Sequence, residues 1–554
     1  MDKTFLVSFM VLCLLSTVFL LGYKATVKGS FDFHVHNLDT GLDYATIQEA
    51  VNANETLDGH SIYVDAGIYY ENVVVNKSIR LIGEDKETTI IDGNGTGNVV
   101  YVTANNVTII GFTIQWSEVY LSGIYVERAD DVNISNNIIE WNDYGITLMF
   151  SHNSILCGNE VLRNWPGITL KYSNNNTICG NIISHNKEPG VSLSASDNNL
   201  IFNNKFLDNL EDIVLIHSEH NVVVSNEITV RTNEGIHVYV GACNNVIANN
   251  SIWGYTPASH TIGIEIYSNN DNVIIGNNIS YHRIGIWLWE SSNTVLSCNR
   301  ISNNTEGGIY LGSYCSDNIL IGNEISHNKA GIWLYIYCHK NTIIGNTVSS
   351  NSEFGIQLEN SGNNTIFHNN FINNTDQALA SAAYNNTWND GYPLGGNYWS
   401  DYNSTDLYSG RYQNETGSDG VGDSPYVIDE HNQDNYPLTS PIPPYYYLLL
   451  ERYNELLGSF RDLNSTYHSL LANFDSLNSI YNNLLSDYNK LQTSYNQLNS
   501  SYTTLQESHK ELQSQQEAII NELNTIKNLM YTFITTTISL ITTTIYLITR
   551  KLKD

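Results

Sequence analysis

Apolar and polar residues alternate in short runs throughout residues 42–379 of the chain. The clearest runs have the general form Asn-x-Ile-x-Gly-Asn-x-Ile, a polar turn, and then Gly-Ile-x-Leu, and they lie at residues 272–288, 318–334 and 341–358. Such alternation is typical of strands that turn one face to a core. The unit repeats every 22 to 27 residues, which is too short for a strand–helix–strand unit and too rich in β-branched residues for a helical repeat. The pattern predicts an all-β parallel solenoid of roughly 12–14 coils, each with two or three short strands.

One asparagine marks the same place in successive units. Stacking the coils in register places each copy about 4.8 Å from the last. Because buried amides need hydrogen-bond partners, we predict an internal ladder at a turn, in which each amide bonds the next. The marked positions are Asn137, Asn159, Asn181, Asn204, Asn226, Asn250, Asn277, Asn299, Asn323, Asn346 and Asn369.

Both ends of such a solenoid need a cover, since an open β edge invites aggregation. Residues 46–53 have the pattern of a short amphipathic helix, and they precede a first strand at 61–64. Residues 380–440 lose the repeat and gain aromatic residues and Gly. We expect the first segment to cap one end and the second segment to cap the other.

A different period begins after a Pro-rich linker at residues 441–452. Over residues 453–528 one seam position holds mostly Tyr and Phe and the other holds Leu or Ile, with 3-4 spacing through eleven heptads. This spacing predicts a long left-handed coiled-coil stalk. Since a lone helix with one apolar seam is unstable in water, we expect a homo-oligomer; the alternative is a single helix lying against the solenoid.

Two apolar segments flank these parts. Residues 529–549 are long enough to cross a bilayer and precede a basic tail at 550–554, which we expect in the cytoplasm. Residues 1–28 have the pattern of a signal peptide or of an uncleaved N-terminal anchor. The solenoid and stalk would then lie outside the cell, on a single-pass membrane protein.

Composition agrees with this placement and excludes one class of partner. Charged residues make up only 15% of the chain, yet the formal net charge is −31, which repels nucleic acid. About sixteen Asn-x-Ser/Thr sequons are present, and such sites receive glycan in exported proteins. The glycosylation candidates are Asn76, Asn106, Asn278, Asn363 and Asn414.

Three motifs carry a family resemblance. The repeat region opens with Ala-Thr-Ile-Gln-Glu-Ala-Val at 45–51 and Ile-Tyr-Val-Asp-Ala-Gly at 62–67, and it closes with Gly-Asn-Tyr-Trp-Ser-Asp-Tyr at 396–402. With the repeats, these motifs resemble the copper-accessory protein NosD and the carbohydrate-binding and sugar-hydrolase (CASH) group, over roughly residues 42–440. The resemblance implies a right-handed parallel β-helix of the pectin lyase type, and surface proteins of archaea are the expected setting.

The x residues of each Gly-Ile-x-Leu-x segment point away from the core. Between residues 237 and 335 they are largely aromatic and are edged by carboxylates, on rungs about 4.8 Å apart. Sugars lay C–H faces on aromatic rings and bond acids through hydroxyls, so we hypothesise a glycan-binding face for surface adhesion. A structural aromatic ladder and a protein interface within a surface layer are the alternatives. The face comprises His237, Tyr239, Glu265, Tyr267, Trp287, Trp289, Tyr310, Trp333 and Tyr335.

Polysaccharide cleavage is a competing hypothesis. A hydrolase needs clustered carboxylates, and a β-helix lyase needs Arg or Lys with Ca²⁺. Acids before Gly-Ile, such as Asp143, Glu188, Glu211 and Glu353, are spread along the repeat at one or two per coil. We therefore prefer solvated turn carboxylates, with Glu265, Glu234 and Asp212 as the weak catalytic candidates, and leave open whether the protein is an enzyme.

Two metals enter as alternatives. Copper delivery, implied by the likeness to NosD, needs clustered Cys, Met or His, but the chain has 4 Met and its His residues are scattered. Calcium suits the carboxylates of Asp419 and Asp423 in a Gly-rich loop, together with Asp434. A metal-free Asp/Gly turn is the other interpretation, and no further cofactor is predicted.

Four cysteines form two stacked pairs. Cys157 and Cys179 occupy one position in adjacent coils, and Cys315 and Cys338 do the same. Stacked cysteines can bridge coils outside the cell, although in-register geometry is not ideal for a disulfide. Both bridges therefore stay open on the sequence alone.

Overall fold

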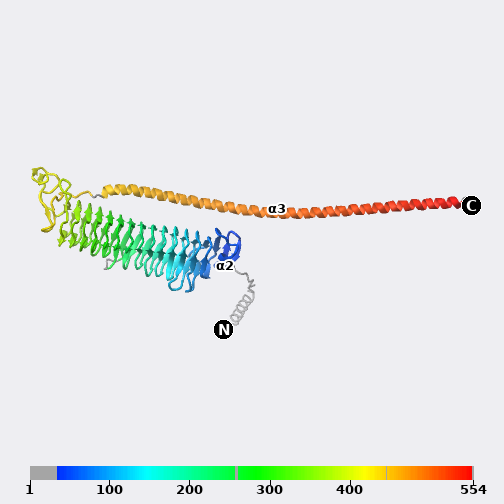
Figure 1. The fold of residues 1–554 in the computed structure, drawn as a ribbon, viewed down its shortest axis with the longest axis horizontal. Helices are drawn as coiled ribbons and strands as arrows, with labels where there is room; N and C mark the ends of the chain where they lie inside the picture. The colour runs from blue at the N-terminus through cyan, green and yellow to red at the C-terminus, as the bar shows by residue number, and fades with distance from the viewer. Residues whose placement is uncertain (1–33, 256–259, 444–445, 552–554) are drawn as a thin grey trace, which may run out of the picture. The chain divides into compact units, whose positions relative to one another are not determined.

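The computed structural model describes residues 34–255, residues 260–443 and one long helix, α3 (Tyr446–Lys551), whose side chains are described over 490–548. The expected N-terminal signal or anchor and the last residues of the basic tail lie outside this described part. The chain divides between Leu450 and Glu451 into two compact units. The first unit is a parallel β-solenoid and the second is the helix (Figure 1).

Three sheets form the solenoid, and each coil contributes one strand to each sheet. The first sheet runs from β3 (Ser61–Val64) to β42 (Thr365–Phe367), and the second from β4 (Gly67–Tyr70) to β43 (Asn370–Ile372). The third sheet has 14 strands, which confirms the predicted number of coils. Its strands are β5 (Val73–Val75), β8 (Val100–Val102), β11 (Ser122–Glu127), β14 (Tyr144–Met149), β17 (Ile168–Lys171), β20 (Val191–Ser194), β23 (Ile213–Ile216), β26 (Glu234–Tyr239), β29 (Ile262–Tyr267), β32 (Ile284–Trp289), β35 (Gly307–Leu311), β38 (Ala330–Tyr335), β41 (Phe354–Glu359) and β44 (Asp376–Ser381).

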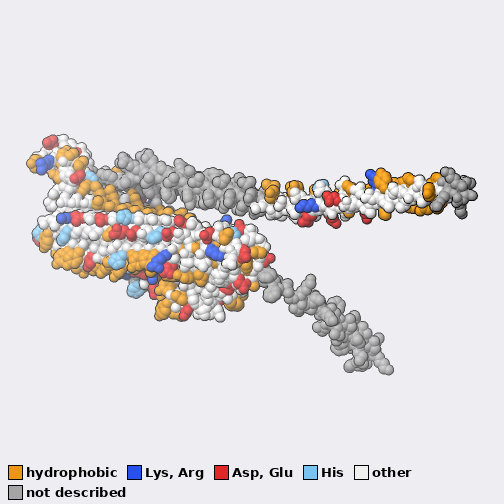
Figure 2. All heavy atoms as spheres, turned by 45° about the vertical axis from the view of Figure 1, so that its right-hand side comes forward, with side chains coloured by type: hydrophobic (Ala, Val, Ile, Leu, Met, Phe, Trp, Pro, Cys, Tyr) orange, Lys and Arg blue, Asp and Glu red, His pale blue; other side chains and the backbone are white. Residues whose placement is uncertain are grey.

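Each of these strands pairs in parallel with its copy in the next coil, so equivalent residues stack. In the third sheet Ile286 pairs with Ile309 and Ile309 with Ile332, and all three are fully buried. The inward residues fill one continuous apolar core, as the alternation predicts. On the surface, acidic side chains and histidines line up in rows along the solenoid, beside bands of hydrophobic side chains (Figure 2).

The predicted asparagine ladder is present and continuous from Asn137 to Asn397. At one rung the backbone N–H and the side-chain amide of Asn299 both donate to Oδ1 of Asn323, at 3.0 Å each. The amide of Asn323 donates in turn to Leu296 O at 2.9 Å and to Oδ1 of Asn346 at 2.9 Å. The residue before each ladder Asn from Asn137 to Asn369 turns the chain with a positive φ, and Gly322 (φ 65°) shows why Gly-Asn recurs in the sequence.

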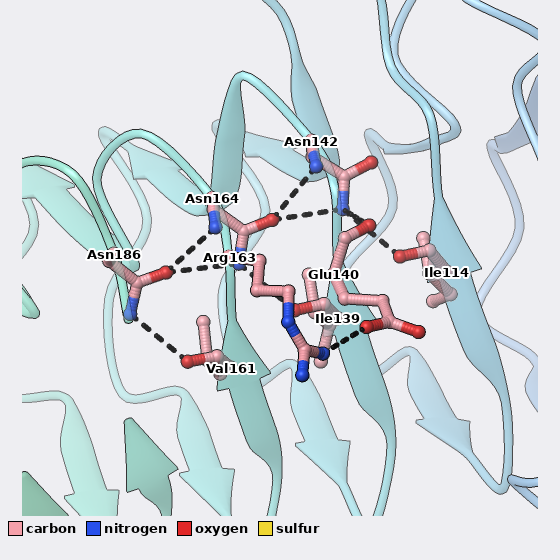
Figure 3. A network of polar contacts seen from close by, with 8 residues as sticks. All are labelled: Ile114, Ile139, Glu140, Asn142, Val161, Arg163, Asn164 and Asn186. Atoms are coloured by element: carbon pink, nitrogen blue, oxygen red, sulfur yellow. Dashed lines mark hydrogen bonds and ion pairs between the residues drawn. The ribbon is translucent and has the colours of Figure 1, made fainter. Parts of the chain in front are cut away.

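Two further asparagine ladders were not predicted. One starts at Asn142, whose amide donates to Oδ1 of Asn164, and Asn164 donates to Asn186 (Figure 3). Each amide of this ladder also donates to a strand carbonyl of the preceding coil, such as Ile139 O at 2.9 Å from Asn164. The other ladder lies in the turn between each strand of the third sheet and the following strand of the first sheet. Its members include Asn176, Asn199, Asn221, Asn245, Asn318, Asn341 and Asn364.

The N-terminal end is covered as expected. Helix α2 (Ile47–Asn52) starts at Thr46, whose hydroxyl accepts from the backbone of Glu49, and its buried side packs on the first coil. Strands β1 (Val35–Asn37) and β2 (Leu42–Tyr44) add antiparallel to the edge of the first sheet. The open edge that the parallel strands would leave is thereby occupied.

Aromatic side chains close the other end. Strand β45 (Tyr398–Trp399) extends the second sheet, and the Trp399 ring stacks between Phe371 at 4.6 Å and Tyr426 at 4.3 Å. Two short hairpins follow, formed by β46 (Tyr408–Ser409) with β47 (Glu415–Thr416) and by β48 (Tyr426–Val427) with β49 (Gln433–Asp434).

The carboxylate of Asp434 ends the continuous asparagine ladder. It accepts from the backbone of Asn397 at 2.7 Å, from the Trp399 indole at 3.1 Å and from the backbone of Tyr436 at 3.1 Å. Burial outweighs these hydrogen bonds and raises the pKa of Asp434 from 3.8 to about 6.

Removing one rung of the ladder should destabilise the solenoid. Asn323→Ala leaves several buried donors and acceptors of neighbouring coils unpaired, so we expect the free energy of unfolding to fall by about 3 kcal/mol. Urea denaturation followed by circular dichroism measures this change. The control is Asn278→Ala, an exposed position on β31 (Asn278–Ser280), and an equal loss in both variants would contradict the ladder's role.

Asp434 should make stability depend on pH. Between pH 3.8 and about 6 the folded carboxyl still holds a proton that an unfolded Asp has released, so stability falls as pH rises through this window. The difference amounts to about 3 kcal/mol. Unfolding measured from pH 4 to 7 should lose this part of the slope in Asp434→Asn, and an unchanged slope in the variant would show that another group is responsible.

Candidate functional site

The outer face of the third sheet carries two columns of side chains that parallel pairing sets in register. The inner column contains His237, Glu265, Trp287, Tyr310, Trp333 and Gln357, and the outer column contains Tyr239, Tyr267, Trp289, Tyr335 and Glu359. All nine residues predicted for the glycan-binding face therefore lie on one surface. They are half-buried except Tyr239, which is exposed.

Neighbouring rings on this face contact one another. The Tyr310 ring lies 5.7 Å from Trp287 and 5.0 Å from Trp333, measured between centroids. Tyr239 and Tyr267 stack at 5.3 Å. The outer column has one gap, at Gly312, where any side chain would overlap the Trp289 ring. These contacts stabilise the sheet by themselves, so they agree with a structural ladder as well as with a binding surface.

A groove of about 460 Å³ lies over strands β32, β35, β38 and β41 of this face, within the size range of small-molecule sites. Its floor contains Trp287, Tyr310 and Trp333. Two ion pairs line it: Arg283 with Glu306 at 2.7 Å, and Lys329 with Glu353 at 3.4 Å. The Arg283 guanidinium also lies 5.3 Å from the centre of the Trp287 ring.

The floor of the groove holds two polar groups with unmet hydrogen bonds. The indole N–H groups of Trp287 and Trp333 are buried and contact no acceptor among the described residues. A buried donor without an acceptor costs about 1–3 kcal/mol. The two groups lie on β32 and β38, on either side of Tyr310.

Four titratable side chains gather at the start of this face, in three adjacent coils. His237 Nδ1 lies 3.0 Å from a carboxylate oxygen of Glu211, and His237 Nε2 lies 3.8 Å from one of Glu265. Glu234 completes the group, and one ligand atom each from Glu211, Glu234 and His237 lie within 4.8 Å of one another. The expectation that the turn acids are dispersed is therefore wrong here, because stacking brings together residues that are 23 to 31 positions apart.

The cluster perturbs the pKa of every member. Burial raises the pKa of Glu234 to about 7, helped by its hydrogen bond to Glu211 and by the charge of Glu265. Burial also raises the pKa of Glu265. For Glu211 burial acts in the same direction, but hydrogen bonds with His237 and Glu234 prevail and lower its pKa. Burial opposes protonation of His237, yet the surrounding carboxylates raise its pKa.

Asp212, the remaining catalytic candidate, lies outside this cluster's polar surface. Only 1% of it is exposed, and its carboxylate accepts from the amide of Asn209 at 2.9 Å. Burial raises the pKa of Asp212 well above its ordinary value. The next coil has no asparagine to accept the hydrogen bond of the Asn209 amide. Asp212 accepts this hydrogen bond instead and so replaces one rung of the ladder.

The proposed calcium ligands do not converge. Asp423 accepts from the backbones of Leu407 and Tyr408 and from the hydroxyl of Thr405. Asp419 accepts from the backbone of Val421 and from Gln413. Asp434 is buried beneath the cap. Each carboxylate therefore accepts its own set of hydrogen bonds, and among the described residues the one three-membered group with metal-ligand spacing is Glu211, Glu234 and His237.

The two stacked cysteine pairs behave differently. Cys157 and Cys179 lie directly opposite each other on adjacent strands and form a disulfide. Cys315 and Cys338 are buried and unbridged, so the second of the two possible bridges is not formed. Their thiols point into a turn and donate to the carbonyls of Leu288 and Gly312 respectively. They occupy the turn position that Ser291 and Ser361 hold in neighbouring coils.

The five glycosylation candidates share one property: their side chains are exposed. This holds for Asn76, Asn106, Asn278, Asn363 and Asn414. The ladder asparagines, by contrast, are buried and hydrogen-bonded. Glycan attachment at the five exposed positions stays a prediction.

Comparison with known proteins identifies a family. The model described as periplasmic copper-binding protein (NosD) matches residues 51–229 and 223–404. A cell surface glycoprotein of Methanothermus fervidus is 36% identical over 118 residues, which cover 20% of this chain and 19% of that protein. A probable pectinesterase/pectinesterase inhibitor of Arabidopsis thaliana is 47% identical over 58 residues, 9% of this chain and 10% of that protein. The chain thus spans well under two thirds of either relative.

Two solved structures align with part of the chain. The A-module of the Azotobacter vinelandii mannuronan C-5 epimerase AlgE6 aligns with a TM-score of 0.41 at 16% identity, covering 62% of this chain and 92% of that chain. The catalytic domain of a GH87 α-1,3-glucanase aligns with a TM-score of 0.34 at 15% identity, covering 61% of this chain and 64% of that chain. At such identities the likeness concerns the fold alone.

Proposed function

The chain belongs to the NosD family, and we propose that it is a membrane-anchored cell-surface protein whose solenoid binds a glycan in the groove over Trp287, Tyr310 and Trp333. The observation that carries this proposal is the groove itself. Its three rings come from successive strands, and charged side chains line the space above them.

The spacing of these rings suits a sugar chain. The centroids of neighbouring rings lie 5.7 Å and 5.0 Å apart along the solenoid, which is close to the length of one hexopyranose unit. Successive sugars would therefore lie on successive rings, with their C–H faces on the aromatic surface. The charged pairs Arg283–Glu306 and Lys329–Glu353 supply donors and acceptors for the hydroxyl groups.

The groove favours binding over cleavage. Its carboxylates, Glu306 and Glu353, are each held in an ion pair, so they act as acceptors and are poorly placed to donate a proton to a leaving group. Hydrolysis needs a protonated acid and a second carboxylate on either side of the bond. A purely structural role in a surface layer is the remaining alternative, and it predicts no ligand.

Helix α3 and the sequons support the surface placement. Within α3 the described stretch Lys490–Ile548 includes a window long and apolar enough to cross a membrane. The basic tail that follows favours a cytoplasmic C-terminus. The exposed sequons and the match to a cell surface glycoprotein agree with an external solenoid.

Copper, which the family's description names, does not match the donor groups of the described residues. Copper sites are built from clustered Cys, Met or His. The group with ligand spacing has one imidazole and two carboxylates, and the paired thiols of Cys315 and Cys338 are buried with no third soft donor described beside them. We therefore derive no function from copper.

The apolar seam of the stalk supports a proposed homo-oligomer. From Leu491 onward its members are exposed on the single helix, with Leu498 at 69% and Leu505 at 68%. A continuous apolar seam of this kind is covered by a second copy in coiled coils.

Glycan binding should depend on the floor of the groove. Trp287→Ala with Trp333→Ala removes two rings, each worth about 0.5–1.5 kcal/mol in stacking, so affinity should fall about tenfold. A glycan array with the full chain in detergent identifies the ligand, and titration calorimetry measures the loss. The matched control is Trp165→Ala, an exposed tryptophan far along the chain. An array without signal, or equal affinity in the double variant, would remove the proposal.

Oligomerisation should depend on the seam. Sedimentation equilibrium of the full chain in detergent should give a multiple of 62.2 kDa, and Leu498→Asp with Leu505→Asp should shift it toward the monomer because charges enter the seam. Ser500→Asp with Ser514→Asp, on the helix face opposite the seam, serves as the control. A monomeric wild-type chain at micromolar concentration would show that the seam is not an interface between copies.

A further inference from the structure

We propose that Glu211, Glu234 and His237 bind a divalent metal ion, with Glu265 orienting the histidine. This site lies outside the aromatic groove and does not depend on glycan binding. Its residues come from the turn before β23, from the first residue of β26 and from an outward position of β26.

The geometry already approximates a coordination sphere. One ligand atom from each residue lies within 4.8 Å of the others. Ligands bound to one Zn²⁺ at about 2.0–2.2 Å lie roughly 3.5 Å apart, so small side-chain rotations suffice. The 3.0 Å contact between His237 Nδ1 and Glu211 is where the ion would replace a shared proton.

The other nitrogen of His237 has the partner that metal-bound histidines use. Nε2 faces a carboxylate oxygen of Glu265 at 3.8 Å, and strand pairing places His237 directly opposite Glu265. Metal-ligating histidines generally donate their second N–H to a carboxylate or carbonyl, which fixes the ring and its tautomer. Nδ1 is then the nitrogen that remains for the ion.

Charge balance favours a cation here. Three carboxylates surround one imidazole, and the side chains of Glu211, His237 and Glu265 are only 19%, 18% and 12% exposed. Among the described residues, no Lys or Arg forms an ion pair with Glu211, Glu234 or Glu265. Concentrating like charges away from water is costly unless a counter-charge is present. A divalent ion supplies that charge, and the remaining exposure gives it access.

The site also lies where the regular ladder stops. The second asparagine ladder runs to Asn209, whose amide turns to Asp212 of its own coil. It resumes only where the backbone of His282 donates to Oδ1 of Asn304, at 2.9 Å. In the coil after Asn209 the described residue at this turn is Thr232, whose hydroxyl donates to Asn209 O at 3.2 Å, and the acidic cluster lies on the outer face of the same coils. Local departures from an otherwise consistent pattern are expected at functional sites.

The donor set selects the kind of ion. Two carboxylates and one imidazole suit Zn²⁺, and also Mn²⁺ with added water, whereas cuprous copper prefers sulfur ligands. We therefore use Zn²⁺ as the probe. The proposed Zn²⁺ site, with one His and two Glu ligands, differs from a copper site, which is made of clustered Cys, Met or His.

Titration calorimetry of the full chain in detergent with Zn²⁺ tests the site. We expect one equivalent to bind per chain, His237→Ala to weaken binding at least a hundredfold, and Glu265→Gln to weaken it about tenfold because only orientation is lost. Cobalt substitution gives a second readout, since its visible absorption reports nitrogen and oxygen ligands and should disappear in His237→Ala.

Glu188→Gln, a carboxylate in the preceding turn, is the matched control and should leave the affinity unchanged. Circular dichroism verifies that each variant keeps the solenoid. Wild-type protein that binds no Zn²⁺ would overturn the proposal whatever the variants do, and the cluster would then be a proton-sharing network only. Binding that survives in both His237→Ala and Glu234→Gln would place the ion elsewhere and overturn it equally.

Discussion

The hydrogen bond from one side-chain amide to the next, along the solenoid axis, is the interaction on which the rest of the structure depends. The side-chain oxygen of a ladder asparagine such as Asn323 accepts two hydrogen bonds from the asparagine of the preceding coil. Its side-chain NH2 group donates to the asparagine of the next coil and to a strand carbonyl. A buried amide that slipped by one residue would lose all of these partners. The ladders therefore hold the coils from Asn137 onward in one register, and the apolar core only has to fill the space between them.

The register also determines which side chains lie next to one another on the surface. Because equivalent residues stack, side chains 22 to 31 positions apart become neighbours, and chemistry can be assembled along the axis. The aromatic groove and the acidic cluster are two outcomes of the same rule on the same face. They differ in that the groove lies over an unbroken repeat, whereas the cluster lies where the second ladder is interrupted.

Several expectations failed for a common reason, namely that one-dimensional spacing does not show where a side chain points. Cys157–Cys179 and Cys315–Cys338 have equivalent spacing, but the first pair lies on adjacent strands and the second points into a turn toward backbone carbonyls. Glu211 and Asp212 are adjacent in sequence, yet one faces the cluster and the other is buried against Asn209. The two extra ladders each had a signal in the sequence. One has an Asn five residues after the marker, at Asn142, Asn164 and Asn186, and the other has an Asn five residues before it, at Asn176, Asn199 and Asn221.

The sequence by itself determined the repeat, the strand alternation, the continuous ladder, the capping helix and the outward positions of the aromatic face, because all of these follow from local period and from the direction of successive side chains. Only the tertiary structure decided which acids meet, which thiols bond and where a groove forms. Those outcomes depend on distances between residues of different coils and on burial. The distances and the burial arise when the coils stack, and no single coil determines them.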